Sequence, residues 1–269
     1  MPLFAESRLA GLGIKIMFEF IWIPLINLLI VFYHIFFNNL GVGVIFFTGF
    51  LILLLVPITN PMLLAMQKMK DFGPELEKIK QKYKGDKTKL MQAQQDFYKA
   101  KGINPASGCL PQVIQIIILI ALFQGFISVF SGQEDITSRL NDILYPPLKL
   151  TGELNTAFLG RDVTKPDVYQ ISQVPFGIPG VFLILSAAVQ FWSSKMMMGQ
   201  TKKAEVIAKK TEGGMDDLMA SFQKQSLYLF PLLTLFIGLK FPLVLVLYWG
   251  SLSLFQALQR YVILKNSNG

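Results

Sequence analysis

Charged residues, cysteine and histidine are all scarce in this sequence, and each shortage excludes a class of protein. Asp, Glu, Lys and Arg make up 16% of the 269 residues, whereas soluble domains carry about 25%. The one cysteine, Cys109, cannot form an internal disulfide. The one histidine, His34, is too few for a multi-histidine metal site, and we find no His-based triad or glycine-rich phosphate loop. We therefore expect no cofactor, no metal and no enzymatic activity.

Apolar residues are abundant instead, and they occur in long runs without charge. Hydrophobic residues make up 52% of the chain, and Phe alone contributes 23. Charged residues are absent from 20–67, 102–133 and 168–194, which are runs of 48, 32 and 27 residues. Because a membrane-spanning helix needs about 20 mostly apolar residues, the sequence predicts an all-α polytopic membrane protein. Its core, residues 41–263, is expected to hold five transmembrane helices, at about 41–66, 110–130, 176–192, 228–239 and 243–263.

Residues 1–40 form an N-terminal segment whose apolar helix, 18–38, has two alternative placements. Asn27, His34 and Asn38 are spaced by seven and four residues, which puts them on one face of a helix. That polar stripe favours a helix lying in the membrane interface. The overall apolar character favours a spanning helix, and the core is the same in either case.

The formal net charge of +8 is distributed unevenly, and this distribution predicts the orientation. Bases exceed acids by five in residues 62–109, by two in 195–224 and by two after Gln259, whereas acids exceed bases by two in 131–175. Because basic loops stay in the cytoplasm, we expect the loop 131–175 outside. Expected in the cytoplasm are the helical hairpin 71–101, the loop 193–225 and the tail 264–269. This is the pattern of a multi-pass bacterial inner-membrane protein with a cytoplasmic C-terminus, and the basic surplus needs no nucleic-acid function to explain it.

Polar side chains within the predicted spans align on helix faces. The aligned groups are Thr48 and Thr59 with Ile52 between them, Gln112 with Gln115, Ser186 with Gln190, and Trp249, Ser253, Gln256 and Gln259. Interhelical hydrogen bonding explains such alignment. A shared polar groove that holds a polar polypeptide segment inside the bilayer explains it equally, because uncharged amides avoid the cost of a buried charge. This set is the candidate substrate groove.

Methionines gather at the predicted cytoplasmic ends of the first and third spans. They are Met62, Met66 and Met69 on one side and Met196, Met197 and Met198 on the other. Flexible, polarizable thioethers suit the binding of varied apolar segments, although ordinary packing at the membrane interface also explains them. They are the candidate rim that receives a client.

Three stretches of the sequence resemble the YidC/Oxa/Alb family of membrane protein insertases. Residues 104–111 read Asn-Pro-Ala-Ser-Gly-Cys-Leu-Pro and are followed by Gln115. Pro57 ends a span ahead of a Met- and Lys-rich helix. The third stretch runs from Phe230-Pro231 to Leu247-Tyr248-Trp249 and ends in Gln256, Gln259 and Arg260. The resemblance covers about residues 22–263.

The resemblance implies five core spans, an interfacial helix before them and a cytoplasmic helical hairpin. It also implies that the chain inserts and folds membrane proteins, with nascent membrane proteins and the lipid bilayer as partners. Whether the Sec translocon and the ribosome are partners stays open. Family members commonly carry an Arg five residues before the position of Pro57, where this chain has Ile52. We count Arg260 with the basic residues after Gln259, at the cytoplasmic end of the fifth span, and we therefore expect a neutral groove.

Two alternatives to an insertase remain at this stage. A small-solute transporter or channel would need a pathway open to both sides, and inverted internal repeats would favour it. We find no such repeats in the sequence. A structural assembly factor would have no groove at all.

Overall fold

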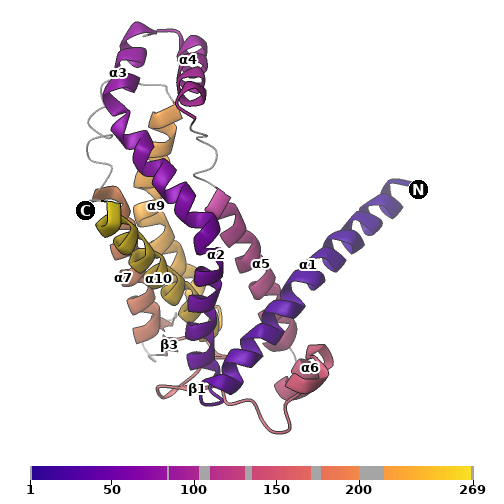
Figure 1. Cartoon of the computed structure of the whole chain (residues 1–269). Coiled ribbons are helices and arrows are strands. Elements are labelled where there is room, and N and C mark those ends of the chain that lie inside the picture. Colours follow the sequence, from indigo (N-terminus) through magenta and orange to yellow (C-terminus); the bar gives the residue numbers. More distant parts are fainter. Residues whose placement is uncertain are drawn as a thin grey trace.

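The computed structural model describes residues 2–83, 85–102, 110–130, 135–170, 177–199 and 215–267, and helices dominate it (Figure 1). The predicted all-α class is therefore confirmed in its coarse form. The elements are α1 (Pro2–Ile35), α2 (Leu40–Asp71), α3 (Gly73–Lys82), α4 (Lys87–Ala100), α5 (Leu110–Phe130), α6 (Ile136–Ile143), η2 (Pro146–Leu148), β1 (Ala157–Phe158), β2 (Arg161–Asp162), β3 (Val168–Tyr169), β4 (Ile178–Pro179), α7 (Val181–Gly199), α9 (Met215–Gly238) and α10 (Leu243–Ser267). Figure 1 shows α3 and α4 at one end of the molecule and α6, β1 and β3 at the opposite end.

The long apolar helices fall into two classes by length. Among the described residues, Leu40–Pro61 of α2 and Val113–Phe130 of α5 are long and apolar enough to cross a membrane. Glu19–Ile35, Val181–Met196 and Leu227–Gly238 are shorter apolar segments of α1, α7 and α9. α10 belongs to neither class, because its serines, glutamines and Arg260 lower its hydropathy. The count of five spans therefore stays a prediction.

Several helices extend beyond the ranges that the sequence predicts. α1 begins at Pro2 rather than near residue 18, and its N-terminal half extends away from the other helices (Figure 1). α7 and α9 continue into the expected loop 193–225, and residues 200–214 between them lie outside the described part of the chain. α10 continues to Ser267, beyond the predicted span 243–263, and Arg260 lies within it. The predicted ranges follow the apolar runs, whereas the helices themselves continue into the polar residues on either side.

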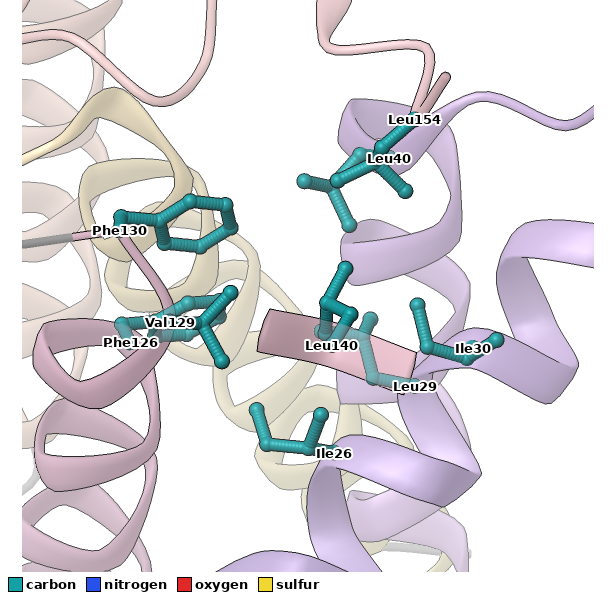
Figure 2. Close-up of a pocket in the computed structure, with 9 residues that line it drawn as sticks. All are labelled: Ile26, Leu29, Ile30, Leu40, Phe126, Val129, Phe130, Leu140 and Leu154. Atoms are coloured by element: carbon teal, nitrogen blue, oxygen red, sulfur yellow. The ribbon is translucent and has the colours of Figure 1, made fainter. Parts of the chain in front are cut away.

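The main apolar core lies at the end of the molecule that carries α6 and the strands. Trp22, Ile26 and Leu29 of α1 are buried against α2 and α5. A small apolar cavity remains there (Figure 2). Its lining is Ile26, Leu29, Ile30, Leu40, Phe126, Val129, Phe130, Leu140 and Leu154, and none of these is a candidate groove residue. This end is a packed anchor for α1, α2 and α5.

The polar stripe of α1 is divided between the core and the surface. Asn27 is buried, donates from Nδ2 to the carbonyl of Ile143 at 3.0 Å and accepts at Oδ1 from the amide of Tyr145 at 2.7 Å. His34 and Asn38 are exposed and hydrogen-bond each other. Asn27 thus ties α1 to the segment after α6. Only the other two residues remain for contact with water or headgroups.

The segment between α6 and α7 caps the ends of two helices. Two antiparallel strand pairs, β1–β2 and β3–β4, fold it back on itself. The carboxylate of Asp167 accepts from the amide of Leu183 in the first turn of α7 at 3.0 Å. The carbonyls of Lys165 and Val163 accept from the amides of Leu243 and Val244 at the start of α10, both at 2.8 Å. These contacts satisfy amides that a helix start leaves unpaired, and they hold α7 and α10 side by side.

α3 and α4 occupy the range in which the sequence predicts a helical hairpin. Asp86 begins α4 by accepting from the amide of Lys89 at 3.0 Å, and Gly85 takes a left-handed φ of +101° in the turn before it. Leu76 and Tyr98 form the apolar contact between the two helices. Lys101 pairs with Glu75 at 2.9 Å and lies over the ring of Phe72, which closes the base of the hairpin. The exposed lysines within α3 and α4 are Lys78, Lys82, Lys87, Lys89 and Lys99.

Candidate functional site

α10 has four faces; two of them pack against neighbouring helices and a third is apolar and exposed. Its most exposed apolar residues, Leu254, Leu258, Tyr261 and Val262, lie together on one side. Phe255 approaches Gly49 of α2 on a second side. Gly250 lies against Ser186 of α7 on a third, where the hydroxyl of Ser186 donates to the carbonyl of Val246 at 3.1 Å. These contacts fix the rotation of α10 in the molecule.

The fourth face of α10 is polar, and it points away from the exposed apolar side. At 100° per residue, Trp249, Ser253, Gln256 and Arg260 fall within an arc of about 60°. All four are half-buried. The side chain of Gln256 makes no hydrogen bond within the described residues. We call these four residues the inner face of α10. The side chains of this face are only partly buried, and they point away from the exposed apolar side of the helix.

Gln259 connects the edge of this face to α2. Its Nε2 donates to Oγ1 of Thr59 and to Oδ1 of Asn60, both at 2.8 Å, and all three residues are half-buried. The hydroxyl of Thr59 in turn donates to the carbonyl of Leu55 at 3.0 Å. Asn60 is absent from the sequence-derived set, although its position beside Thr59 and before Pro61 could have indicated it.

Gln115 connects α5 to α10. Its Nε2 donates to the hydroxyl of Tyr248 at 2.7 Å, and Tyr248 is almost completely buried. Sequence reasoning quoted Tyr248 only as part of a motif. Its phenol needs a polar partner when buried, and a glutamine in another apolar helix was the available signal. Gln112 is the other α5 candidate, and its side chain lies outside the described residues.

The two candidates on α7 are used between helices. Gln190 is buried, and its Oε1 accepts from the hydroxyl of Thr234 on α9 at 2.8 Å. Ser186 is buried against α10. For these two residues the geometry agrees with interhelical hydrogen bonding. Their hydrogen bonds are made to Val246 and Thr234, and not to the residues of the inner face of α10.

The candidates on α2 share one face but differ in their surroundings. Thr48, Ile52 and Thr59 fall within an arc of about 40° at 100° per residue. Thr48 is fully buried and donates to the carbonyl of Val44 in its own helix at 2.7 Å. Ile52 is 8% exposed, so this apolar position is nearly buried. Polarity on this side begins at Thr59.

Most side chains of the methionine rim lie outside the part of the chain that the structure describes. Met196 is half-buried near the end of α7. The side chains of Met62, Met66, Met69, Met197 and Met198 lie outside the described residues. Among the described residues, no group of three His, Cys, Asp or Glu side chains is arranged to hold a metal ion. Among the side chains that the structure describes, the site offers neutral hydrogen-bonding groups and Arg260.

Comparison with known proteins places the chain in a family. The family model described as "60Kd inner membrane protein" matches residues 31–268. A membrane protein insertase YidC of Fusobacterium nucleatum is 29% identical over 228 residues, which are 85% of this chain and 87% of that protein. Those of Methylobacterium radiotolerans and Rickettsia typhi are 30% and 27% identical, over 93% and 87% of this chain but only 36% and 37% of their own length. The chain thus spans little more than a third of these two relatives. It belongs to the 60Kd inner membrane protein family, the family of the YidC membrane protein insertases.

Proposed function

We propose that this chain inserts client membrane proteins into the bilayer and helps them fold, with the inner face of α10 as the surface that receives a client's polar segment. The observation that carries the proposal is the state of that face. Trp249, Ser253 and Gln256 are half-buried on the side of α10 opposite its exposed apolar residues. Polar groups there are shielded from lipid and still free to bind a passing peptide.

Neutral polar groups on three helices fit this task. Gln115 of α5, Thr59 of α2 and Gln259 of α10 lie on one flank of the inner face, and each already takes part in a hydrogen bond between helices. Such bonds are typically worth about 0.6 kcal/mol in membrane proteins, so a client's peptide groups can replace them at little cost. A client's polar segment would exchange partners with these amides and hydroxyls instead of crossing bare hydrocarbon.

The short apolar segments of α7 and α9 favour a locally thin bilayer. The apolar part of α9, Leu227–Gly238, spans about 18 Å at 1.5 Å per residue, and that of α7, Val181–Met196, spans about 24 Å. A typical hydrocarbon core is about 30 Å thick. Lipid adjusts to a short helix by thinning. The distance over which a client's polar segment lacks water would shrink accordingly.

The driving force in this proposal comes from the client itself. Its apolar helix moves from the aqueous side into lipid and gains about 25 cal/mol for each Å² of apolar surface buried. The α3–α4 hairpin, with its exposed lysines, would lie on the cytoplasmic side and receive the emerging client. The bilayer and nascent membrane proteins are the proposed partners. Docking to the Sec translocon or the ribosome would add delivery routes to the same face.

Reconstitution tests the proposal directly. The full chain is placed in liposomes, and a single-span client is offered and assayed by protease protection of its translocated tail. We expect protection above that of protein-free liposomes, and we expect the gene to complement a bacterium depleted of its insertase. The double variant Ser253→Leu/Gln256→Leu should lose most of the activity. The matched variant Leu254→Val/Leu258→Val, on the exposed side of the same helix, should keep it.

The transporter alternative gives a different result in the same liposomes. It predicts solute flux through the wild-type chain without client insertion. That outcome, or equal insertion by both double variants, would contradict the proposed role of the inner face.

A further inference from the structure

Two turns at the end of the molecule that carries α6 and the strands each present a large apolar side chain. Phe37 lies in the turn between α1 and α2 and is 85% exposed. Leu159 is the first residue of the two-residue turn between β1 and β2 and is 78% exposed. We call these two residues the apolar tips. One exposed apolar residue is ordinary on a protein surface, so the backbone and the neighbours of the tips decide what they mean.

The backbone at both tips is unfavourable for a bulky residue. Phe37 and Leu159 have left-handed φ angles of +64° and +47°, and the residues that follow them, Asn38 and Gly160, are left-handed too. Between paired strands, two such residues form a type I′ turn, which prefers Asn or Gly because this conformation strains bulky side chains. Strain of this kind persists where the surrounding structure or a function requires it. The local backbone gives no reason for Phe or Leu, so the reason lies in what their side chains contact.

Hydrogen bonds hold the two turns side by side. Nδ2 of Asn39 donates to the carbonyl of Ala157 at 2.7 Å, and the amide of Leu40 donates to the carbonyl of Asn155 at 3.1 Å. Figure 1 shows β1 at the junction of α1 and α2, and β1 contacts α2. The two apolar tips therefore belong to one small unit of the structure, although they are distant in the sequence.

This unit lies where two apolar helices end. The apolar segment of α1 ends at Ile35, and the segment of α2 that is long enough to cross a membrane begins at Leu40. The ring of Phe36 stacks on that of Phe46 in α2, with the ring centroids 3.8 Å apart. From there, exposed apolar residues continue along one side of α2, namely Phe46, Phe50, Leu53 and Leu54. The tips are therefore continuous with a side of α2 that meets lipid.

We infer that the apolar tips insert into the headgroup–hydrocarbon boundary of the lipid leaflet at this end of the molecule, which the loop charges predict to be the outer one. Hydrocarbon covers Phe37 and Leu159, and the exposed amides of Asn38 and Asn155 beside them stay among headgroups and water. A protein partner fits less well, because two side chains bury far less than the roughly 1,000 Å² of a specific protein interface. Lipid needs no minimum area.

The anchor would also set the depth of α7 and α10. The carbonyls of Val163 and Lys165, just after β2, accept from the amides at the start of α10, and Asp167 accepts from an amide in the first turn of α7. The segment that carries the Leu159 tip is thus the segment that holds these two helix ends. The inference needs no client and goes beyond the proposed function.

The test measures the surroundings of each tip in the full chain, reconstituted in vesicles of phosphatidylethanolamine and phosphatidylglycerol. The one cysteine is removed by Cys109→Ala, and Phe37→Cys or Leu159→Cys then carries an environment-sensitive fluorophore. The quenchers are a nitroxide on the lipid acyl chain and iodide on both sides of the membrane. We expect both labels to be quenched by the nitroxide and protected from iodide. A label at Glu153→Cys, an exposed charged position of the same segment, should show the reverse.

Leu159→Asn separates a lipid anchor from a structural role of the side chain. Asn-Gly is a preferred type I′ pair, so this variant relieves the turn while it removes the apolar group. The label at Phe37→Cys should become more accessible to iodide, and unfolding in detergent should be no easier than before. Leu159→Met keeps an apolar side chain and should leave the quenching of that label unchanged.

Three results would overturn the inference. Quenching of both tip labels by iodide alone would place the tips in water. Protection from both quenchers would assign them to a protein contact, such as a second copy of the chain. A Leu159→Asn variant that leaves the label at Phe37→Cys unchanged would show that the two tips do not act together. None of these results bears on client insertion, so the proposed function would stand in each case.

Discussion

The contact between α7 and α9 and the inner face of α10 both place polar side chains in apolar helices, but with opposite results. Gln190 and Thr234 are buried and satisfy each other across the α7–α9 contact. Ser253 and Gln256 stay half-buried on α10, and Gln256 has no hydrogen-bond partner within the described residues. A polar residue in an apolar helix thus serves packing when it is closed off and binding when it stays accessible. Substitutions can test whether the two regions really differ in this way.

Adding a charge on the two sides of α10 that flank its inner face should give the largest effects. Ala257 is almost fully buried on the α7 side of α10, and Ile52 is nearly buried on the α2 face that leads to Thr59. Arg at a helix centre in lipid costs about 2.5–3.5 kcal/mol. We expect Ala257→Arg to lose that much unfolding free energy or fail to accumulate. Ile52→Arg should lose less and should improve insertion of clients with acidic tails. Equal destabilisation in a detergent unfolding assay would contradict a difference between the packed α7 side and the α2 side.

Removing the bond between α7 and α9 should have a moderate effect. Gln190→Leu and Thr234→Val each remove one partner of a buried hydrogen bond, and the double variant removes both. Interhelical hydrogen bonds in membrane proteins couple by about 0.6 kcal/mol on average and up to about 1.7. We expect a coupling energy in that range from a double-mutant cycle on unfolding free energies. Client insertion should change only as far as stability does, and a selective loss of insertion would place this pair in the groove instead.

Truncating the inner face should barely change stability. Gln256 makes no hydrogen bond within the described part of the chain, so Gln256→Ala should alter the unfolding free energy by less than about 0.5 kcal/mol. Insertion should still fall, because the client loses a donor. A stability loss as large as that of Gln190→Leu would show that Gln256 is a packing residue.

The smallest expected effect is a pH response outside the proposed membrane region. Partial burial raises the pKa of Asp162, but hydrogen bonds from the hydroxyl and amide of Thr164 oppose this and outweigh it. The pKa therefore lies below its ordinary value of 3.8. The carboxylate therefore stabilises the β1–β2 turn above pH 3.8, and this contribution is lost as the pH falls through the lowered value. Exchange protection of the Thr164 amide should drop in acid. In Asp162→Asn this pH dependence should be absent.

The sequence predicts where the helices lie in the chain better than it predicts which residues of other helices they contact. Charge-free runs locate α2 and α5 because a long apolar run has few alternatives to a membrane helix. A helical wheel groups Trp249, Ser253, Gln256 and Gln259, since the 3.6-residue period depends on the backbone alone; in the structure Gln259 bonds to α2 at the edge of that group. The same wheel cannot tell that Gln190 meets Thr234, because the partner lies on another helix. Asn27 shows the same limit, since a stripe that suggested the interface includes a residue whose partners come from residues 143 and 145.

The remaining differences come from contacts that are distant in the sequence. The strands between α6 and α7 are only two residues long, and they form where this segment caps α7 and α10. No local sequence pattern predicts strands that short. The predicted fifth span ends at residue 263, where the apolar run ends, yet α10 continues to Ser267. Arg260, which the sequence analysis counts with the basic residues after Gln259, lies on the inner face of that helix.

Site-specific photo-crosslinking during insertion tests the central claim most directly. A photoreactive amino acid is placed at Gln256 on the inner face or at Leu258 on the exposed side, and a client is arrested with its polar tail halfway across. The account predicts that the tail crosslinks to position 256 and not to position 258. Crosslinks of the tail to position 258 alone, or equal crosslinks to both, would contradict a polar face that receives the client.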